Sequence, residues 1–201
     1  MCIISADAAN CYDRVHHGIM ALVFAALGVN NGLISEMLHS IQPMKFFLCT
    51  GWGESYSPIG GNIMRNLHEL CQGNGASPAV WIMISSVFFM VYKNLGFGSK
   101  VKSPMTLVLL SIMGVLFVDD KDLYIMSDNI KTQRETWEEA QRALTAWGKL
   151  LIASRGLLKP EKCFYYLIAY VWNTNVSWAY AEMNPTDTLR VPQSSGHSIP
   201  I

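Results

Sequence analysis

Apolar residues form two patterns along this chain: short uninterrupted runs and longer runs that repeat every three to four residues. The short runs are typical of buried strands, and the longer period is typical of helices with one buried face. Strands are predicted at 2–7, 45–50, 54–57 and 163–171, and helices at 16–27, 32–41, 78–93 and between a cap at Ser127 or Asp128 and a stop at Gly156. The predicted buried faces contain Ile19, Leu22, Val23 and Ala26 in the first helix, and Trp137, Ala140, Leu144, Trp147 and Leu151 in the last.

Two segments are strongly apolar, 79–92 and 105–118. Each is shorter than the roughly 18–20 residues that span a bilayer, so we expect a buried helix and a buried strand and no membrane segment. A small membrane protein built on these two segments is a weaker alternative.

The second apolar segment ends in two adjacent carboxylates, Asp119 and Asp120, and a further apolar run follows at 123–126. This pattern predicts a β-hairpin with the carboxylates at or beside its turn. Two neighbouring anions repel each other, so the pair indicates either a divalent metal site or a solvated turn, where Asp is common.

Three other places carry candidate chemistry. Asp7 stands at the end of a predicted strand. The adjacent His16 and His17 face different ways on a helix and indicate a polar helix start rather than a metal site. A glycine-containing loop precedes a helix with Ser77 as its N-cap, and it suits either a phosphate or an ordinary loop-to-helix junction.

Composition limits the class of protein. With 201 residues, 51% of them hydrophobic, the chain can form one domain with a substantial core. Its 15 basic and 15 acidic residues give a net charge of zero, which argues against a self-sufficient nucleic-acid binder. The cysteines contain no CxxC pair and no targeting signal is seen, so we expect a reduced intracellular setting, cytoplasmic or nuclear. They are Cys2, Cys11, Cys49, Cys71 and Cys163.

Four motifs, in this order, resemble those of reverse transcriptases. Residues 7–13, DAANCYD, are similar to the first palm motif, an aspartate followed five positions later by an aromatic residue. Residues 72–78, QGNGASP, match QGxxxSP, and residues 117–120, FVDD, match aromatic-x-Asp-Asp. Residues 156–163 resemble the loop after the long palm helix. The chain looks most like retrotransposon enzymes of the non-LTR type.

The resemblance implies an α+β polymerase palm: an antiparallel sheet with helices packed on one face. It assigns residues 1–171 to this palm-like domain and residues 172–201 to a β-prone tail that leads toward a missing thumb. Only six residues precede Asp7. We therefore expect fingers and thumb to be largely absent and the chain to be a fragment that is inactive in isolation.

The resemblance also implies RNA-directed DNA polymerisation, in which two Mg²⁺ (or Mn²⁺) ions assist transfer of a nucleotide from dNTP to a primer 3′-OH. Asp7, Asp119 and Asp120 would hold the ions. The remaining implied contacts are the backbone carbonyl of Ala8 to the second metal, the Tyr12 ring against a ribose 2′-OH, Gln72 and Gly73 at the nucleotide and template, and Lys162, or else Lys159, near the pyrophosphate. Tyr12 as plain core and the lysines as plain surface are the alternatives.

The expected partners of a full-length enzyme are an RNA template with a DNA primer and dNTP. Because Lys and Arg contacts to phosphate dominate nucleic-acid affinity, the neutral chain alone should bind nucleic acid weakly. The alternative function is a catalytically inactive retroelement remnant with at most a binding role.

Overall fold

A computed structural model of the chain describes residues 1–9, 11–60, 75–117, 120–126, 132–182 and 188–201. The chain forms two compact units, which are described separately. The first contains Met1–Cys11 and Ser85–Ile201, and the second contains Tyr12–Ile84. Within the described ranges, no helix combines the length and apolarity needed to cross a bilayer.

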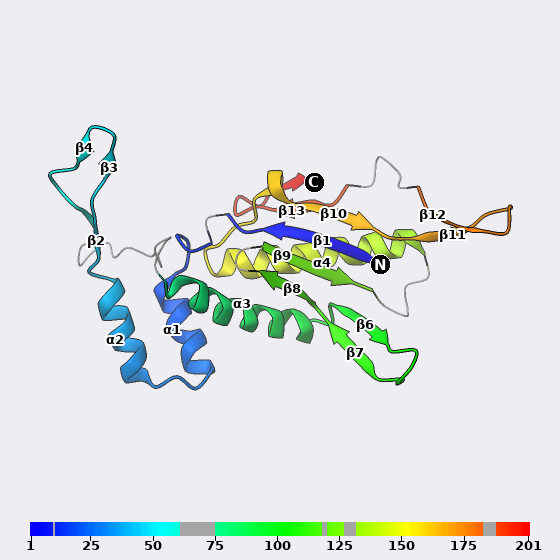
Figure 1. The fold of residues 1–201 in the computed structure, drawn as a ribbon, viewed down its shortest axis with the longest axis horizontal. Coiled ribbons are helices and arrows are strands. Elements are labelled where there is room, and N and C mark those ends of the chain that lie inside the picture. Colours follow the sequence, from blue (N-terminus) through cyan, green and yellow to red (C-terminus); the bar gives the residue numbers. More distant parts are fainter. Residues whose placement is uncertain (10, 61–74, 118–119, 127–131, 183–187) are drawn as a thin grey trace. The chain divides into compact units, whose positions relative to one another are not determined.

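The first unit is built on a four-stranded antiparallel sheet (Figure 1). Its central strand β1 (Cys2–Asp7) was predicted with these bounds, and its neighbours are β10 (Phe164–Leu167) and β9 (Asp120–Ile125). The outer strand β8 (Gly114–Phe117) pairs with β9. The predicted hairpin that ends in acidic residues is therefore confirmed as β8–β9, with Phe117 opposite Asp120.

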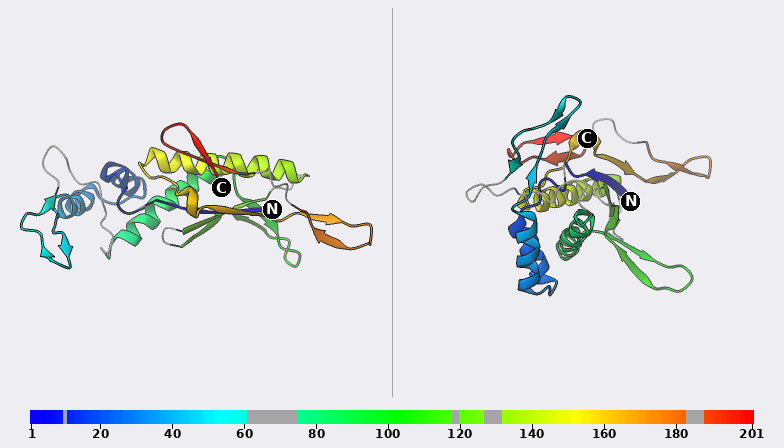
Figure 2. Two further views of the ribbon diagram at one scale, coloured as in Figure 1. Left: turned by 90° about the horizontal axis from the view of Figure 1, so that it is seen from above. Right: turned by 60° about the vertical axis from the view of Figure 1, so that its left-hand side comes forward.

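Helix α4 (Gln133–Ala153) contacts β1 and β9 and runs along one face of this sheet (Figure 2). Alternate residues of β1 (Cys2, Ile4 and Ala6) are buried, whereas Ile3, Ser5 and Asp7 are half-buried on the opposite face. This alternation is what a strand produces when helices cover one side of its sheet. The predicted α+β class, with an antiparallel sheet and helices on one face, matches this unit.

The core of the first unit lies around Trp147, whose side chain is 0% exposed. Its ring contacts those of Phe88, Phe89 and Tyr92 at centroid distances of 6.3, 5.0 and 5.8 Å. These three rings belong to α3 (Ser77–Asn94), which was predicted to start one residue later and crosses from the second unit to the first. One side of helix α3 is exposed, and it carries four large apolar residues: Ile82, Met83, Met90 and Val91.

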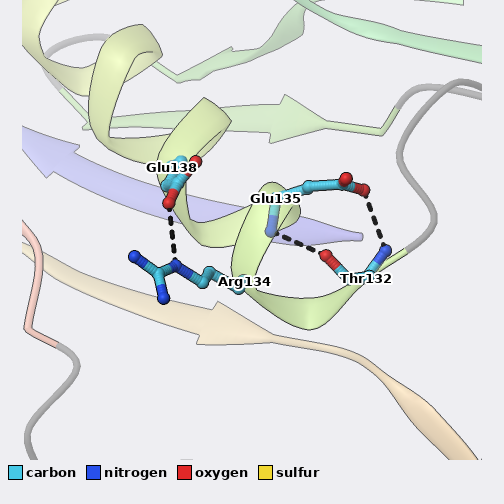
Figure 3. Close-up of polar contacts among 4 residues, drawn as sticks. All are labelled: Thr132, Arg134, Glu135 and Glu138. Atoms are coloured by element: carbon cyan, nitrogen blue, oxygen red, sulfur yellow. Dashed lines mark hydrogen bonds and ion pairs between the residues drawn. The ribbon is translucent and has the colours of Figure 1, made fainter.

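The predicted N-cap of α4 was wrong. Thr132 caps the helix, and its Oγ1 accepts a hydrogen bond of 3.1 Å from the backbone N–H of Glu135 (Figure 3). The Glu135 carboxylate accepts one of 3.1 Å from the Thr132 backbone N–H. This reciprocal capping box fixes the start of the helix, so the earlier candidates Ser127 and Asp128, which lie outside the described residues, do not cap it. The predicted buried residues Ala140, Leu144, Trp147 and Leu151 are confirmed, and Trp137 is half-buried.

A C-terminal hairpin packs against α4. It consists of β13 (Arg190–Pro192) and β14 (Ser198–Pro200), and Val191 is fully buried. The hairpin approaches the helix at Gly148, where an added Cβ would collide with the ring of Pro192. A glycine at this helix position thus permits close packing that any larger residue would obstruct.

The prediction that 105–118 forms one buried strand was wrong. The segment contains β7 (Leu109–Ile112), which pairs with β6 (Ser99–Lys102) in a separate hairpin, and then β8. Met105 is 92% exposed, and both residues before β7, Leu107 and Val108, are exposed. Two short strands that pair with different partners have the same apolar composition as one long strand, so the sequence pattern does not separate the two arrangements.

The predicted strand 163–171 is likewise two strands. After β10, the chain enters a hairpin of β11 (Tyr170–Trp172) and β12 (Trp178–Tyr180). Cross-strand ring pairs stabilise this hairpin, with centroids 4.9 Å apart for Tyr170 and Tyr180 and 5.0 Å apart for Trp172 and Trp178.

The second unit contains α1 (His17–Ala26) and α2 (Asn31–Ile41), both close to their predicted bounds. His16 caps α1 by accepting a hydrogen bond from the Gly18 N–H, so the prediction of a polar helix start holds for this residue. Of the predicted buried face of α1, Val23 is buried and Ile19 is half-buried, but the prediction was wrong for Leu22 and Ala26, which are exposed. The buried residues of α1 are His17, Met20, Val23 and Phe24.

The remaining strands of the second unit are short. The predicted strands 45–50 and 54–57 are replaced by two small antiparallel pairs. One is β2 (Lys45–Phe46) with β5 (Ile59–Gly60), and the other is β3 (Cys49–Thr50) with β4 (Gly53–Glu54).

Candidate functional site

Asp7 and Asp120 lie directly opposite each other at one end of the main sheet. The carbonyl of Asp7 accepts a hydrogen bond of 2.9 Å from the Lys159 N–H, on the side of β1 away from β9. Toward β9, the pair is therefore a non-hydrogen-bonded one, in which opposed Cα atoms are only about 4.5 Å apart and side chains approach closely. Two carboxylates on the same sheet face at this spacing repel each other, which calls for a positive charge between them.

Lys162 supplies a positive charge at this place. Its Nζ lies 3.2 Å from Oδ2 of Asp7. The Asp7 side chain is 12% exposed, and that of Lys162 is 60% exposed. Lys159, the other lysine of the loop, points its ammonium to Glu161 at 3.7 Å instead. Of the two lysines that the sequence left as alternatives, Lys162 forms the ion pair with Asp7.

The loop that carries Lys162 is anchored to the main chain at Asp7 and at the two residues that follow it. Besides the bond from Lys159, the Ala9 N–H donates to the Leu157 carbonyl at 2.8 Å, and Ala8 forms a β-bridge with Leu158. The hydrogen bonds to the loop are made by the carbonyl of Asp7 and the N–H of Ala9. Because backbone groups alternate in direction along a strand, the carbonyl of Ala8 points to the other side, toward β9.

Cys163 borders the site on the buried side, and its Sγ lies 3.9 Å from the carbonyl of Asp7. Burial is the largest influence on this thiol and raises its pKa, and the negative charge of Asp7 acts in the same direction. The backbone contact to Asp7 and the positive charge of Lys121 act against that rise. Lys121 itself is 1% exposed, because the alternation of β9 turns it to the helix-covered face.

Sequence reasoning missed Asp122 as a member of this sheet face. It lies two residues from Asp120 in β9, so both side chains point to the open face, and its partner in β1 is Ser5. Phe164 of β10 is opposite Ser5 on the other side. The signal was present in the sequence, since period-two alternation puts Asp120 and Asp122 on one face once the segment is known to be a strand.

The described structure does not test the other predicted site residues. Asp119, Gln72 and Gly73 lie outside the described residues. Tyr12 belongs to the second unit and is half-buried. The predicted roles of these residues therefore stay predictions.

The donor set at the end of β1 suits a hard cation. Asp7 and Asp120 offer carboxylate oxygens, the ligands that Mg²⁺ and Mn²⁺ prefer. The Lys162 ammonium already occupies a cation position beside Asp7. Among the residues that the structure describes, no group of three or more His, Cys, Asp or Glu side chains is arranged to hold a metal ion. Asp7 and Asp120 are the two described carboxylates that would hold a metal ion at this place.

The described residues thus define a class: an α+β domain with an antiparallel sheet whose end presents two opposed carboxylates. No family model matches the sequence, and no curated protein matches it. Solved structures do share the fold. Telomerase from Candida tropicalis, in complex with a TWJ fragment of telomeric RNA, has a TM-score of 0.53 at 12% identity over 82% of this chain. Telomerase from Candida albicans, also in complex with a TWJ fragment, has a TM-score of 0.50 at 14% identity over 92% of this chain.

This similarity concerns the fold. The chain has a reverse-transcriptase-like fold, and it spans only 26% and 32% of the two telomerase chains. The resemblance noted in the sequence is supported at that level, while the assignment to non-LTR retrotransposons stays a prediction.

Proposed function

We propose that this chain provides the palm of an RNA-directed DNA polymerase and contributes the carboxylates of its nucleotidyl-transfer centre. The observation that carries the proposal is the direct opposition of Asp7 and Asp120 at the end of the main sheet. These two residues come from two separate sequence motifs, and the reverse-transcriptase-like fold pairs them in register.

In this proposal, Asp7 and Asp120, together with Asp119, hold Mg²⁺ or Mn²⁺. Two ions held there would supply activation of the attacking 3′ oxygen and stabilisation of the leaving one during in-line phosphoryl transfer. The protein contributes mainly by positioning the ligands and by balancing charge. The carbonyl of Ala8 would serve as a further oxygen ligand in this proposal.

The remaining assignments of the proposal concern substrates. Tyr12 discriminates against the ribose 2′-OH, Gln72 and Gly73 contact the incoming dNTP and the template, and Lys162 faces the leaving pyrophosphate. The substrates are an RNA template with a DNA primer and dNTP. Because the net charge is zero, we propose that tight binding of primer and template depends on parts of a longer enzyme.

Metal binding by the chain tests the proposal. Mn²⁺ binding is measured by electron paramagnetic resonance and by the metal-induced rise in melting temperature, for the wild-type chain and for Asp7→Asn and Asp120→Asn. We expect each substitution to remove most of the binding, because each deletes an anionic ligand. Glu161→Gln is the control, since Glu161 lies in the loop and pairs with Lys159.

Primer extension on an RNA template, with a full-length enzyme that contains these residues, tests the activity. Loss of Mn²⁺ binding in Asp7→Asn with loss of extension supports the polymerase. Mn²⁺ binding that is equal in the wild type and Asp7→Asn contradicts it and favours the alternative, a catalytically inactive remnant.

A further inference from the structure

The ion pair between Lys162 and Asp7 places an ammonium at a carboxylate that the proposed function assigns to metal ions. The Nζ to Oδ2 distance is 3.2 Å, within direct contact. A metal ion that binds the Asp7 carboxylate would lie close to the Lys162 ammonium. The two cations would repel each other. Lys162 and a metal ion are therefore competitors for Asp7.

The fold places the main chain of Lys162 close to Asp7. Lys162 ends a short 3₁₀ helix (Pro160–Lys162), and its backbone N–H bonds to the Lys159 carbonyl at 2.9 Å. The Lys159 N–H in turn donates to the carbonyl of Asp7 at 2.9 Å. The main chain from which the Lys162 side chain extends is thus tied to the residue whose carboxylate it contacts.

We infer that Lys162 is a built-in counter-cation of Asp7 that a divalent metal ion displaces, so that metal binding and release of the Lys162 ammonium are coupled. This inference rests on the proposed function. In the metal-free chain, Lys162 offsets one of the two charges of Asp7 and Asp120 and limits their repulsion. Once a metal ion binds Asp7, the ammonium no longer pairs with that carboxylate and can contact another anion near the site.

The released ammonium matters for the order of binding. Its long side chain keeps the charge near the site, where a polyphosphate anion that coordinates the same metal ion would arrive. Lys162 therefore weakens the binding of the metal ion to Asp7. After the metal ion has bound, the positive charge of Lys162 strengthens the binding of an anionic ligand. A lysine fixed by burial could not make this exchange, but the exposed side chain of Lys162 can.

The test compares Mn²⁺ affinity, measured by electron paramagnetic resonance at low ionic strength, in the wild type, Lys162→Met, Lys162→Arg and Lys159→Met. Methionine keeps an apolar stem without the charge, and arginine keeps the charge. Exposed ion pairs contribute little free energy, so we expect Lys162→Met to bind Mn²⁺ about two- to five-fold more tightly. Lys162→Arg should resemble the wild type, and Lys159→Met should be unchanged because its ammonium pairs with Glu161. The gain in Mn²⁺ affinity of Lys162→Met over the wild type should become smaller as KCl is added.

The outcomes separate this inference from the proposed function. If Asp7→Asn abolishes Mn²⁺ binding but Lys162→Met binds as the wild type does, or more weakly, the proposed function stands and the inference is overturned. Tighter binding by Lys159→Met of equal size also overturns it, since the effect would then be one of general charge. If no variant binds Mn²⁺ in an Asp7-dependent way, the inference and the metal site fail together. Circular dichroism melting curves establish that each variant is folded.

Discussion

The side chain of Gln141 holds the backbone of Arg190 by two hydrogen bonds. Its Nε2 donates to the Arg190 carbonyl at 2.9 Å, and its Oε1 accepts from the Arg190 N–H at 2.7 Å. An amide side chain thus pairs with a peptide group as another β-strand would. This contact joins α4 to the C-terminal hairpin of β13 and β14, although the helix and the hairpin are far apart in the sequence.

Replacing Gln141 should therefore loosen the hairpin. We expect Gln141→Ala to lower the free energy of unfolding by about 2 kcal/mol, since a neutral hydrogen bond contributes about 1 kcal/mol. Urea denaturation measures the loss. The matched control is Gln133→Ala on the same helix, whose side-chain Nε2 donates to the Glu182 carbonyl at a longer distance of 3.5 Å. Because alanine has a higher helix propensity than glutamine, an equal loss in both variants would contradict the assignment of the effect to the Arg190 contact.

The capping box of α4 predicts a second stability effect. Thr132→Ala removes the acceptor of the Glu135 N–H and should cost about 1 kcal/mol of unfolding free energy. Thr132→Ser should retain most of the stability because its hydroxyl can cap in the same way. The nearby Arg134→Ala breaks an exposed ion pair of 3.0 Å with Glu138 and should change stability by less than about 0.5 kcal/mol. Thermal melting of the three variants checks this order, and a larger loss in Arg134→Ala would refute it.

The raised pKa of the Cys2 thiol predicts that the free energy of unfolding depends on pH. Burial raises the pKa of its thiol from the ordinary value of 9.0 to about 12. The folded state therefore keeps the thiol protonated while the unfolded state ionises above pH 9.0. Stability due to Cys2 is complete below that pH and is lost as pH rises toward about 12.

The measurement is the unfolding free energy between these pH values for the wild type and Cys2→Ala. We expect the wild type to lose up to about 1.4 kcal/mol more per pH unit than the variant. Cys163, whose pKa is also raised, is present in both proteins and does not affect the difference. Parallel pH profiles would contradict the assignment of the effect to Cys2.

The sequence by itself determined the elements whose pattern is local. Strand β1, helix α2 and the buried face of α4 follow from alternation or helical period within a single segment. The β8–β9 hairpin is also local, because its two strands are adjacent in the chain. Asp7 was recognised at a strand end, and Asp120 at a hairpin, from neighbouring residues alone.

Only the tertiary structure decided what depends on distant partners. The apolar segment 105–118 divides between two hairpins because its parts pair with different strands, which no local pattern records. Thr132, not Ser127 or Asp128, caps α4, since several polar residues there satisfy the same preference. Lys162, rather than Lys159, reaches Asp7 because backbone bonds between the loop and β1 orient it. Packing and pairing between segments far apart in the chain select among alternatives that are equal in local free energy.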